Sequence, residues 1–516
     1  MRKTMSMFAA SAVALAVSSY ASADDQRYII KFKAGKGAAV KSQMRQASGR
    51  SALALSKHNA MAAYLPEQAL RAMANNPNVE YVEPDVKRHL MAQEVPFGIS
   101  MVQADQVSDV AAGNRTVCII DSGYDIGHED LSGNAVTGTN DSGTGNWYED
   151  QLGHGTHVAG TIAAINNGTG VVGVLPNGNV NLHIVKVFVG RTWGYSSTLV
   201  AATDVCVANG ADVLNMSLGG ERKSRTEERA FANLYGQGVL SIAAAGNDGN
   251  TRHSYPASYD SVVSVAAIDS DKNIADFSQQ TDQVELSAPG VAILSSVPVG
   301  SGTDASLTVS GSDVDANGME GSPLASATGA LVDCGLGDTA CTAAAGEVCL
   351  ISRGDISFAE KVQACEAGGG IGAIIYNNEA GLVSGTLGET VTGIPSVGIS
   401  DTDGAALLTQ LGSSATVTVE ASDYGYNNGT SMATPHVAGV AALVWSHYPS
   451  CAPGEIRAAL DATAEDLGAA GRDNAYGYGL VQAKAAFDYL AANACSGSNP
   501  GGGSGGGGNG GGKPNR

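Results

Sequence analysis

Residues 117–123 of the 516-residue chain read VCIIDSG: four apolar residues, a carboxylate and a small polar turn. Such a short apolar run between polar residues is typical of a strand that is buried on both faces. Further runs of this kind follow, and segments of helical character separate them. The alternation predicts an α/β fold with a parallel sheet covered by helices on both faces. The other runs are Leu182–Phe188, Asp212–Met216, Val239–Ala245 and Val262–Ala267.

Polar residues stand where these strands end and where two helices begin. Asp121 ends the first run, and Asn247 follows the run at 239–245. His154 opens HGTHVAGT (154–161), and Ser431 lies in NGTSMATP (428–435). A serine hydroxyl needs an imidazole to take its proton and a carboxylate to orient that imidazole. Ser431, His154 and Asp121 fit these roles, and the Asn247 amide and the Ser431 backbone N–H can stabilise an oxyanion.

Each motif taken alone has a plainer explanation, because Asp at a strand end and Ser at a helix start often serve only as caps. All four in the order Asp, His, Asn, Ser, with these flanking residues, resemble the subtilisin-like serine proteases. The resemblance covers most of residues 92–490 apart from an insert. It implies a doubly wound α/β catalytic domain and a secreted serine endopeptidase, which hydrolyses extended protein and peptide substrates through an acyl-enzyme.

The resemblance also implies a substrate-binding site. The segment SLGG (217–220) matches the edge along which an extended substrate pairs as an added strand. In the family, the residue before Tyr255-Pro256 lies at the base of the primary specificity pocket and is often glycine. Here that residue is Ser254, which leaves the depth of the pocket open. The implied substrate-binding residues are Ser217, Leu218, Gly219, Ala244, Gly246 and Ser254.

A calcium site is implied in the same way. Residues 165–171 read INNGTGV and resemble the calcium loop of the family, and Gln93 and Asp130 match its distant ligands. Ca²⁺ takes oxygen ligands from carboxylates, amides and backbone carbonyls. The alternative is an ordinary surface turn rich in Asn and Gly. The implied ligands are the side chains of Gln93, Asp130 and Asn167 and the carbonyls of Ile165, Thr169 and Val171.

The N-terminal part of the chain divides into a leader and a small α+β unit. Residues 1–23 begin with basic residues, continue with a short apolar run and end in ASA, as secretory signal peptides do. Residues 24–91 contain strands expected at 27–33 and 79–82 and a helix at 66–73. Within them, NPNVEYVEPD (76–85) resembles the family's propeptide, which assists folding and inhibits the enzyme. AQEVPFG (92–98) resembles a mature N-terminus, so we expect self-cleavage after Met91.

The catalytic domain is expected at 92–298 and 423–495. Between these parts, a Gly-, Ser- and Thr-rich segment at 299–422 predicts a β-rich insert. Its sequences RGDISF (353–358) and GAIIYNN (372–378) resemble a protease-associated domain. Such an insert either biases substrate access and protein contacts or forms a passive lid. The glycine tract at 496–516 cannot bury a core and is expected to be flexible.

Composition narrows the choice of partners and compartment. The chain has 29 Lys and Arg against 50 Asp and Glu. Because a nucleic-acid partner requires a basic surface, we expect no nucleic-acid partner. No stretch is apolar over a length that spans a bilayer, so we expect a soluble exported protein without a membrane partner. Eight cysteines in such a protein favour disulfides. Their spacing does not determine the pairing; the pairs that we expect are Cys118–Cys206, Cys334–Cys341, Cys349–Cys365 and Cys451–Cys495.

Two other classes of function compete with proteolysis: a catalytically silent binding protein and a structural or adhesive exported protein. The complete set of four motifs argues against both. His157 lies three residues after His154, but the carboxylate of a zinc-protease helix motif is missing. We therefore expect His157, and likewise His436, to pack in the core. Trp193 and Tyr195 either line a more distant substrate pocket or anchor a loop.

Overall fold

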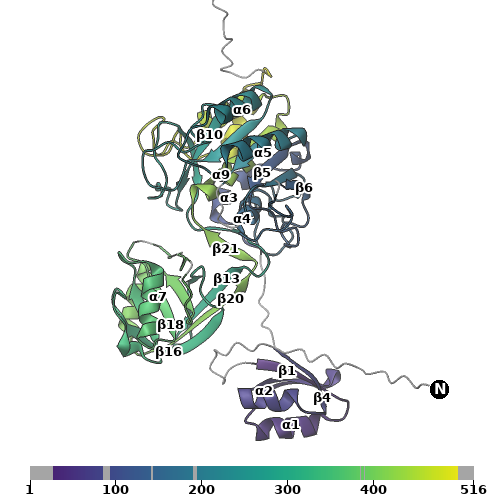
Figure 1. Cartoon of the computed structure of the whole chain (residues 1–516), viewed down its shortest axis with the longest axis vertical. Coiled ribbons are helices and arrows are strands. Elements are labelled where there is room, and N and C mark those ends of the chain that lie inside the picture. The colour runs from purple at the N-terminus through teal and green to yellow at the C-terminus, as the bar shows by residue number, and fades with distance from the viewer. Residues whose placement is uncertain are drawn as a thin grey trace, which may run out of the picture. The chain divides into compact units, whose positions relative to one another are not determined.

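The computed structural model of the protein describes residues 27–84, 93–140, 143–189, 194–379, 381–383, 385–388 and 390–497. The expected signal peptide, the cleavage site after Met91, and nearly all of the glycine tract lie outside these residues. The chain divides into two compact units, one of which is formed chiefly by Met1–Leu90 (Figure 1). Within the described ranges, no helix is both long and apolar enough to cross a membrane.

The smaller unit is an α+β sandwich with its own core. Two helices cover a four-stranded sheet whose order is β2-β3-β1-β4, and β1 is antiparallel to both of its neighbours. The strands and helix expected at 27–33, 66–73 and 79–82 are confirmed. The sequence pattern did not indicate β2, and nearly all of its residues are exposed in the structure. The elements are β1 (Arg27–Phe32), α1 (Gly37–Gln46), β2 (Arg50–Leu55), β3 (Ala60–Tyr64), α2 (Glu67–Ala74) and β4 (Val79–Pro84).

A seven-stranded sheet forms the centre of the larger unit. Its order is β11-β10-β9-β8-β5-β7-β6, and every pair of neighbours is parallel. All five apolar runs of the sequence are strands of this sheet, which confirms the parallel α/β fold. The strands are β5 (Thr116–Asp121), β6 (Ala135–Asn140), β7 (Asn181–Lys186), β8 (Val213–Met216), β9 (Leu240–Ala244), β10 (Val262–Ile268) and β11 (Val284–Pro289).

Side chains alternate between the two faces of this sheet, and helices cover both faces (Figure 1). In β5, Val117 and Ile119 belong to one hydrophobic core, whereas Cys118 and Ile120 belong to the other. The first core also contains residues of α4 (His154–Ala163), α9 (Thr430–His447), α10 (Pro453–Thr463) and α11 (Ala483–Ala492). The second contains residues of α5 (Ser196–Ala208) and α6 (Arg225–Gly236). The sheet is therefore doubly wound, as expected.

The insert leaves and rejoins the catalytic part of the chain at one strand pair, in which β12 (Ile293–Ser296) is antiparallel to β21 (Tyr424–Asn427). It contains an eight-stranded sheet in the order β14-β13-β20-β16-β17-β18-β19-β15. The expected β-rich insert is therefore present. Its elements are β13 (Gly302–Val309), β14 (Ser312–Val314), β15 (Asn317–Gly318), β16 (Ala325–Asp333), β17 (Val348–Ser352), α7 (Phe358–Ala367), β18 (Gly372–Tyr376), β19 (Ser396–Ile399), α8 (Asp401–Leu407) and β20 (Ser414–Ser422).

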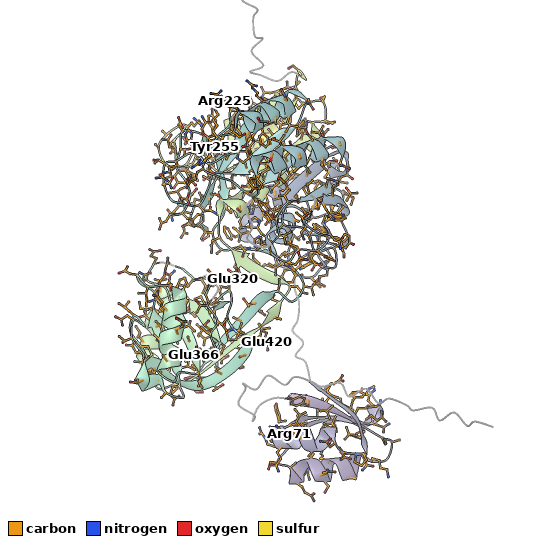
Figure 2. The ribbon with its side chains drawn as sticks, in the orientation of Figure 1. Arg71, Arg225, Tyr255, Glu320, Glu366 and Glu420 are labelled. Atoms are coloured by element: carbon orange, nitrogen blue, oxygen red, sulfur yellow. A yellow bond between two sulfur atoms is a disulfide. The ribbon has the colours of Figure 1, made fainter. Side chains whose placement is uncertain are left out.

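The RGDISF motif stabilises the insert itself. Ser357 caps α7, since its hydroxyl accepts a hydrogen bond from the N–H of Glu360 while the Glu360 carboxylate accepts one from the Ser357 N–H. Arg353 donates to the side-chain oxygen of Asn377 at 2.9 Å. At the other end of α7, Glu366 accepts a hydrogen bond from the Gly393 N–H (Figure 2). These contacts join α7 to the loops that surround it.

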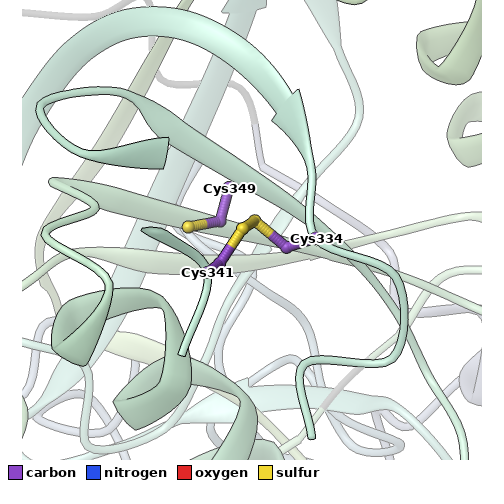
Figure 3. Close-up of side chains that lie close together, drawn as sticks. All are labelled: Cys334, Cys341 and Cys349. Carbon is purple, nitrogen blue, oxygen red and sulfur yellow. A yellow bond between two sulfur atoms is a disulfide. The ribbon is translucent and has the colours of Figure 1, made fainter. Parts of the chain in front are cut away.

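All four expected disulfides are present: Cys118–Cys206, Cys334–Cys341, Cys349–Cys365 and Cys451–Cys495. In the insert, the sulfur of Cys349 lies beside the Cys334–Cys341 bridge (Figure 3). A group of three cysteines can suggest a metal site, but these sulfurs are oxidised and cannot act as thiolate ligands. The bridges therefore serve the fold.

The Cys118–Cys206 bridge joins β5 to α5 and closes a loop of 88 residues, whereas Cys334–Cys341 closes a loop of 7. Because a cross-link restricts the unfolded chain more when its loop is longer, replacing Cys118 and Cys206 by Ala should lower the free energy of unfolding by about 2–5 kcal/mol. The loss should exceed that from replacing Cys334 and Cys341. Calorimetric unfolding of both double variants measures this order, and the reverse order would contradict the account.

Candidate active site

The structure joins Asp121, the last residue of β5, to His154, the first residue of α4. The Nδ1 atom of His154 lies 2.8 Å from Oδ1 of Asp121. Asp121 is buried, whereas the side chain of His154 is 29% exposed. A carboxylate oxygen can only accept, so Nδ1 carries the proton, and Nε2 of the neutral ring is left as a base.

A second carboxylate, which the sequence analysis missed, fixes the start of α4. Asp150 is buried, and its Oδ2 accepts a hydrogen bond from the Thr156 N–H at 2.8 Å, as an N-terminal cap does. Its Oδ1 accepts from the hydroxyl of Ser122 at 2.9 Å. The same hydroxyl accepts from the Gly155 N–H at 2.9 Å. Ser122 and Asp150 thus hold the first turn of α4 against the end of β5. The available signal was an acidic residue four positions before His154.

Glycine is required at the second position of α4. A Cβ atom at Gly155 would lie 2.3 Å from the carbonyl oxygen of Gly123, which is too close for any side chain. The close approach of α4 to the loop after β5 therefore depends on Gly155, and it brings His154 within reach of Asp121.

The pKa of His154 is shifted in the opposite direction from those of two buried histidines, His157 and His436. Burial lowers the pKa of His154, but the charge and hydrogen bond of Asp121 and the charge of Asp150 together raise it above its ordinary value of 6.5. Burial lowers the pKa of His157 to about 3 and that of His436 to about 4. His157 and His436 are fully buried and contact backbone carbonyls, so they pack in the core as expected.

Ser431 lies in the first turn of α9, where Gly429 precedes the helix with φ +152°, a conformation that favours glycine. Pro435 lacks the N–H that would bind the Ser431 carbonyl in a regular helix. The hydroxyl of Ser217 occupies this carbonyl instead, at 2.7 Å. In return, the Ser431 hydroxyl donates to the Ser217 carbonyl at 3.1 Å. In the described part of the chain, the Ser431 hydroxyl makes this bond rather than one to His154.

Asn247 lies beside the same helix start. Its Oδ1 accepts hydrogen bonds from the N–H and the hydroxyl of Thr430, at 2.9 and 2.8 Å. These bonds fix the amide, and among the described residues no acceptor binds its Nδ2. The first N–H groups of a helix also lack intrahelical partners. Asn247 and the start of α9 therefore present hydrogen-bond donors beside Ser431.

A cavity of about 730 Å³ opens next to Ser431 and Asn247. Five of the six substrate-binding residues that the sequence implied line it; the sixth, Ser217, contacts Ser431 instead. Tyr255, visible in Figure 2, and the exposed Tyr195 also line the cavity, whereas Trp193 lies outside the described residues. The five lining residues are Leu218, Gly219, Ala244, Gly246 and Ser254.

The residues implied as calcium ligands gather around the loop at 165–171. Nε2 of Gln93 donates hydrogen bonds to two converging carbonyls, those of Ile165 at 2.9 Å and Val171 at 3.3 Å. Asn167 donates to Oδ1 of Asp130 at 2.8 Å. Carbonyls that point at one place beside a carboxylate form the all-oxygen set that Ca²⁺ takes. Reversing the Gln93 amide would turn its oxygen to the same place, so Gln93, Asp130, Ile165 and Val171 fit a calcium ion. The side-chain oxygen of Asn167 instead accepts hydrogen bonds from the N–H and the hydroxyl of Thr169.

Comparisons with known proteins agree with this geometry. The subtilase family matches residues 113–332 and 397–479, and the PA domain matches residues 327–407. Subtilisin amylosacchariticus from Bacillus subtilis subsp. amylosacchariticus is 37% identical over 289 residues, which cover 54% of this chain and 75% of that protein. Subtilisin DY from Bacillus licheniformis is 42% identical over 213 residues, 40% of this chain and 76% of that protein.

A solved structure is also similar. It is the psychrophilic subtilisin-like protease Apa1 from the Antarctic psychrotroph Pseudoalteromonas sp. AS-11, which is 49% identical and has a TM-score of 0.67. The match covers 79% of this chain and 100% of that one. The family match spans more than half of the chain and includes both the Asp–His pair and the serine at the helix start. The chain therefore belongs to the subtilase family, with an inserted protease-associated domain, and is a serine endopeptidase with an Asp-His-Ser triad.

Proposed function

We propose that Asp121, His154 and Ser431 are the catalytic triad of this endopeptidase. The 2.8 Å hydrogen bond between Asp121 and His154 carries the proposal, because it leaves Nε2 of the imidazole as a base. The Ser431 oxygen attacks the scissile carbonyl and passes its proton to Nε2. His154 returns this proton to the leaving amine, and an acyl-enzyme remains. Water, deprotonated by His154, then attacks the acyl carbonyl. The ester bond to Ser431 breaks, the acid leaves, and His154 returns the proton to the Ser431 oxygen.

The tetrahedral intermediates carry a negative oxygen, which needs fixed donors. Nδ2 of Asn247 and the backbone N–H of Ser431 are the donors in this proposal. The Thr430 bonds to Oδ1 support it, since they hold the amide in place before substrate binds. Loss of one such side-chain donor typically costs about 3–4 kcal/mol in the transition state.

The substrate is an extended polypeptide. The segment at 217–220, which follows β8, offers a backbone edge to which a substrate strand can pair. The cavity beyond it receives the side chain of P1, the substrate residue whose carbonyl Ser431 attacks. Unfolded or flexible proteins meet this requirement.

We also propose that the enzyme is exported and activates itself. Residues 1–23 direct export, and residues 24–91 form a propeptide that inhibits the catalytic domain until cleavage after Met91. Two features support this: the separate core of the α+β unit and the distribution of charge. Residues 1–91 carry 13 Lys and Arg against 6 Asp and Glu, a net charge of +7, which leaves 16 against 44, or −28, for the rest. Opposite charges favour association.

A structural Ca²⁺ ion completes the proposal. Gln93, Asp130, Ile165, Asn167, Thr169 and Val171 would hold it. The ion would supply no chemistry to the peptide bond; it would join the segment near residue 93 to the loop after α4. The converging carbonyls at Gln93 support this assignment.

Replacing Ser431 by Ala tests the triad. The variant has no nucleophile, so casein digestion should fall by about 10⁶-fold, and a serine-directed fluorophosphonate should no longer label the protein. Ser446→Ala is the matched control, because Ser446 is buried on the same helix and its hydroxyl donates to the Leu443 carbonyl, away from the triad.

The same variant tests self-activation. Mass spectrometry should find Ser431→Ala with its N-terminal unit still attached, whereas the Ser446→Ala protein should begin near Ala92. Normal cleavage of the Ser431→Ala precursor would point to another processing enzyme, and full labelling of this variant would refute the triad.

The pH dependence of kcat/KM tests the role of His154. The reaction needs the neutral imidazole, and the pKa of His154 is raised above 6.5, so activity should fall as the pH drops through a value above 6.5. Asp121→Asn removes the charge that raises this pKa, so the acidic limb should move to lower pH. The rate should also fall by about 10⁴-fold. Asp125→Asn, a control without contact to the imidazole, should leave the limb unchanged; an unmoved limb in Asp121→Asn would argue against the pair.

Calcium removal tests the metal site. Excess chelator should lower the melting temperature of the mature enzyme, because an ion that binds only the folded state stabilises it. Asp130→Asn should weaken this effect, since it removes the carboxylate ligand. Asp269→Asn serves as the control, because it also removes one carboxylate but Asp269 is not a proposed ligand. A melting temperature that does not respond to chelator would exclude the proposed ion.

A further inference from the structure

Two polar side chains that line the cavity beside Ser431 each have an oxygen that makes no hydrogen bond within the described residues. Gln279 is 3% exposed and Ser254 is 6% exposed, and both line the cavity. The described residues provide no hydrogen bond to Oε1 of Gln279 or to the hydroxyl of Ser254. Neither oxygen is sealed from the cavity, so each can accept a hydrogen bond from a group that enters it. Hydrogen-bonding oxygens that face a substrate cavity can select a ligand that pairs with them.

The orientation of the Gln279 amide is determined by its neighbours. Nε2 donates to the carbonyl of Arg252, and the backbone N–H of Gln279 donates to the Gly246 carbonyl at 3.0 Å. An amide oxygen cannot face the Arg252 carbonyl, so Oε1 must point the other way. It lies against Gly246, where a Cβ atom would be only 1.8 Å from it.

The Ser254 hydroxyl lies against another glycine, Gly219 in the segment at 217–220. A Cβ atom on Gly219 would lie 2.5 Å from the Ser254 hydroxyl oxygen. The backbone at residues 219 and 246 therefore approaches these two oxygens closely, as glycine allows. Other parts of the cavity wall are apolar, namely Leu218 and Ala244. Apolar walls with a few placed polar groups are typical of a site that selects its ligand.

We propose that Gln279, assisted by Ser254, determines P1 specificity by accepting a hydrogen bond from the P1 side chain. The pocket then selects side chains that end in a neutral N–H or O–H donor, such as Gln and Tyr, over apolar side chains of the same shape. This inference rests on the proposed function, since it requires Ser431 to attack the P1 carbonyl. Gln279 lies 33 positions beyond Gly246 in the chain and has no motif of its own.

Charge offers a competing basis for selection, because Asp248 also lines the cavity. A lysine at P1 would respond to this carboxylate as well as to Gln279. Neutral pairs of equal shape remove this ambiguity. Gln and Met form one pair and Tyr and Phe the other, since in each pair only the first member donates a hydrogen bond.

The test measures kcat/KM of the mature enzyme on peptides that differ only at P1. Gln should exceed Met, and Tyr should exceed Phe, by roughly 3- to 10-fold. Gln279→Met should bring both ratios close to 1, because it removes the acceptor and nearly preserves the shape. Gln280→Met is the matched control, since Gln280 is the neighbouring residue and does not line the cavity. Ser254→Ala should lower the ratios in part, whereas Ser258→Ala should not change them.

Three results would overturn the inference. One is a ratio of 1 or less in the unaltered enzyme, which needs no variant to fold. Another is a ratio that Gln279→Met leaves unchanged. The third is a preference for Lys that Asp248→Asn removes and Gln279→Met does not. In each case, labelling of Ser431 and casein digestion would show that the proposed function still holds; their loss would remove both proposals.

Discussion

A parallel sheet that buries both faces restricts where polar groups can lie, and the larger unit follows this restriction. The central strands β5, β8 and β9 are largely apolar, so reactive groups are confined to their ends. Asp121 ends β5, Ser217 follows β8 and Asn247 follows β9. These three strands are neighbours in the sheet, in the order β9-β8-β5. Parallel direction places their carboxyl ends on one edge, where the proposed site lies.

Two helix starts supply the remaining groups. His154 and Ser431 lie in the first turns of α4 and α9, and each turn is fixed by a side chain from outside its helix. Asp150 accepts a hydrogen bond from the Thr156 N–H at the start of α4, and Ser217 satisfies the carbonyl that Pro435 leaves free in α9. The helix turns that carry the imidazole and the hydroxyl are therefore held in place by hydrogen bonds before any substrate binds. Such preorganisation is the main contribution that a protein scaffold makes to catalysis.

Much of the fold and of the candidate site could be predicted from the sequence, because apolar runs and motifs are local signals. Five of the seven strands were expected, and the disulfide pairs were confirmed. The missed strands differ in composition. β6 is partly exposed, and β11 contains Glu285, which is buried against Arg457 in a 2.5 Å ion pair. A charged residue paired across 172 positions has no local signature.

The site residues that were missed also lack a local signature, because their partners lie far away in the sequence. Asp150 and Ser122 are ordinary polar residues until folding brings them together, and Gln279 acquires its place only through Gly246 and Arg252. Motifs identify the atoms that react, because chemistry restricts those residue types. The residues that position reacting groups, or that contact a substrate side chain, are restricted only by the fold.

A crystal structure of the mature protein with a peptidyl phosphonate bound covalently tests the central claim most directly. The account predicts a bond from the phosphonate to Oγ of Ser431, with Nε2 of His154 within about 3.2 Å of that oxygen. The phosphonate oxygen should face Nδ2 of Asn247. An adduct on another residue, or an imidazole that lies many ångströms from Ser431, would contradict the account.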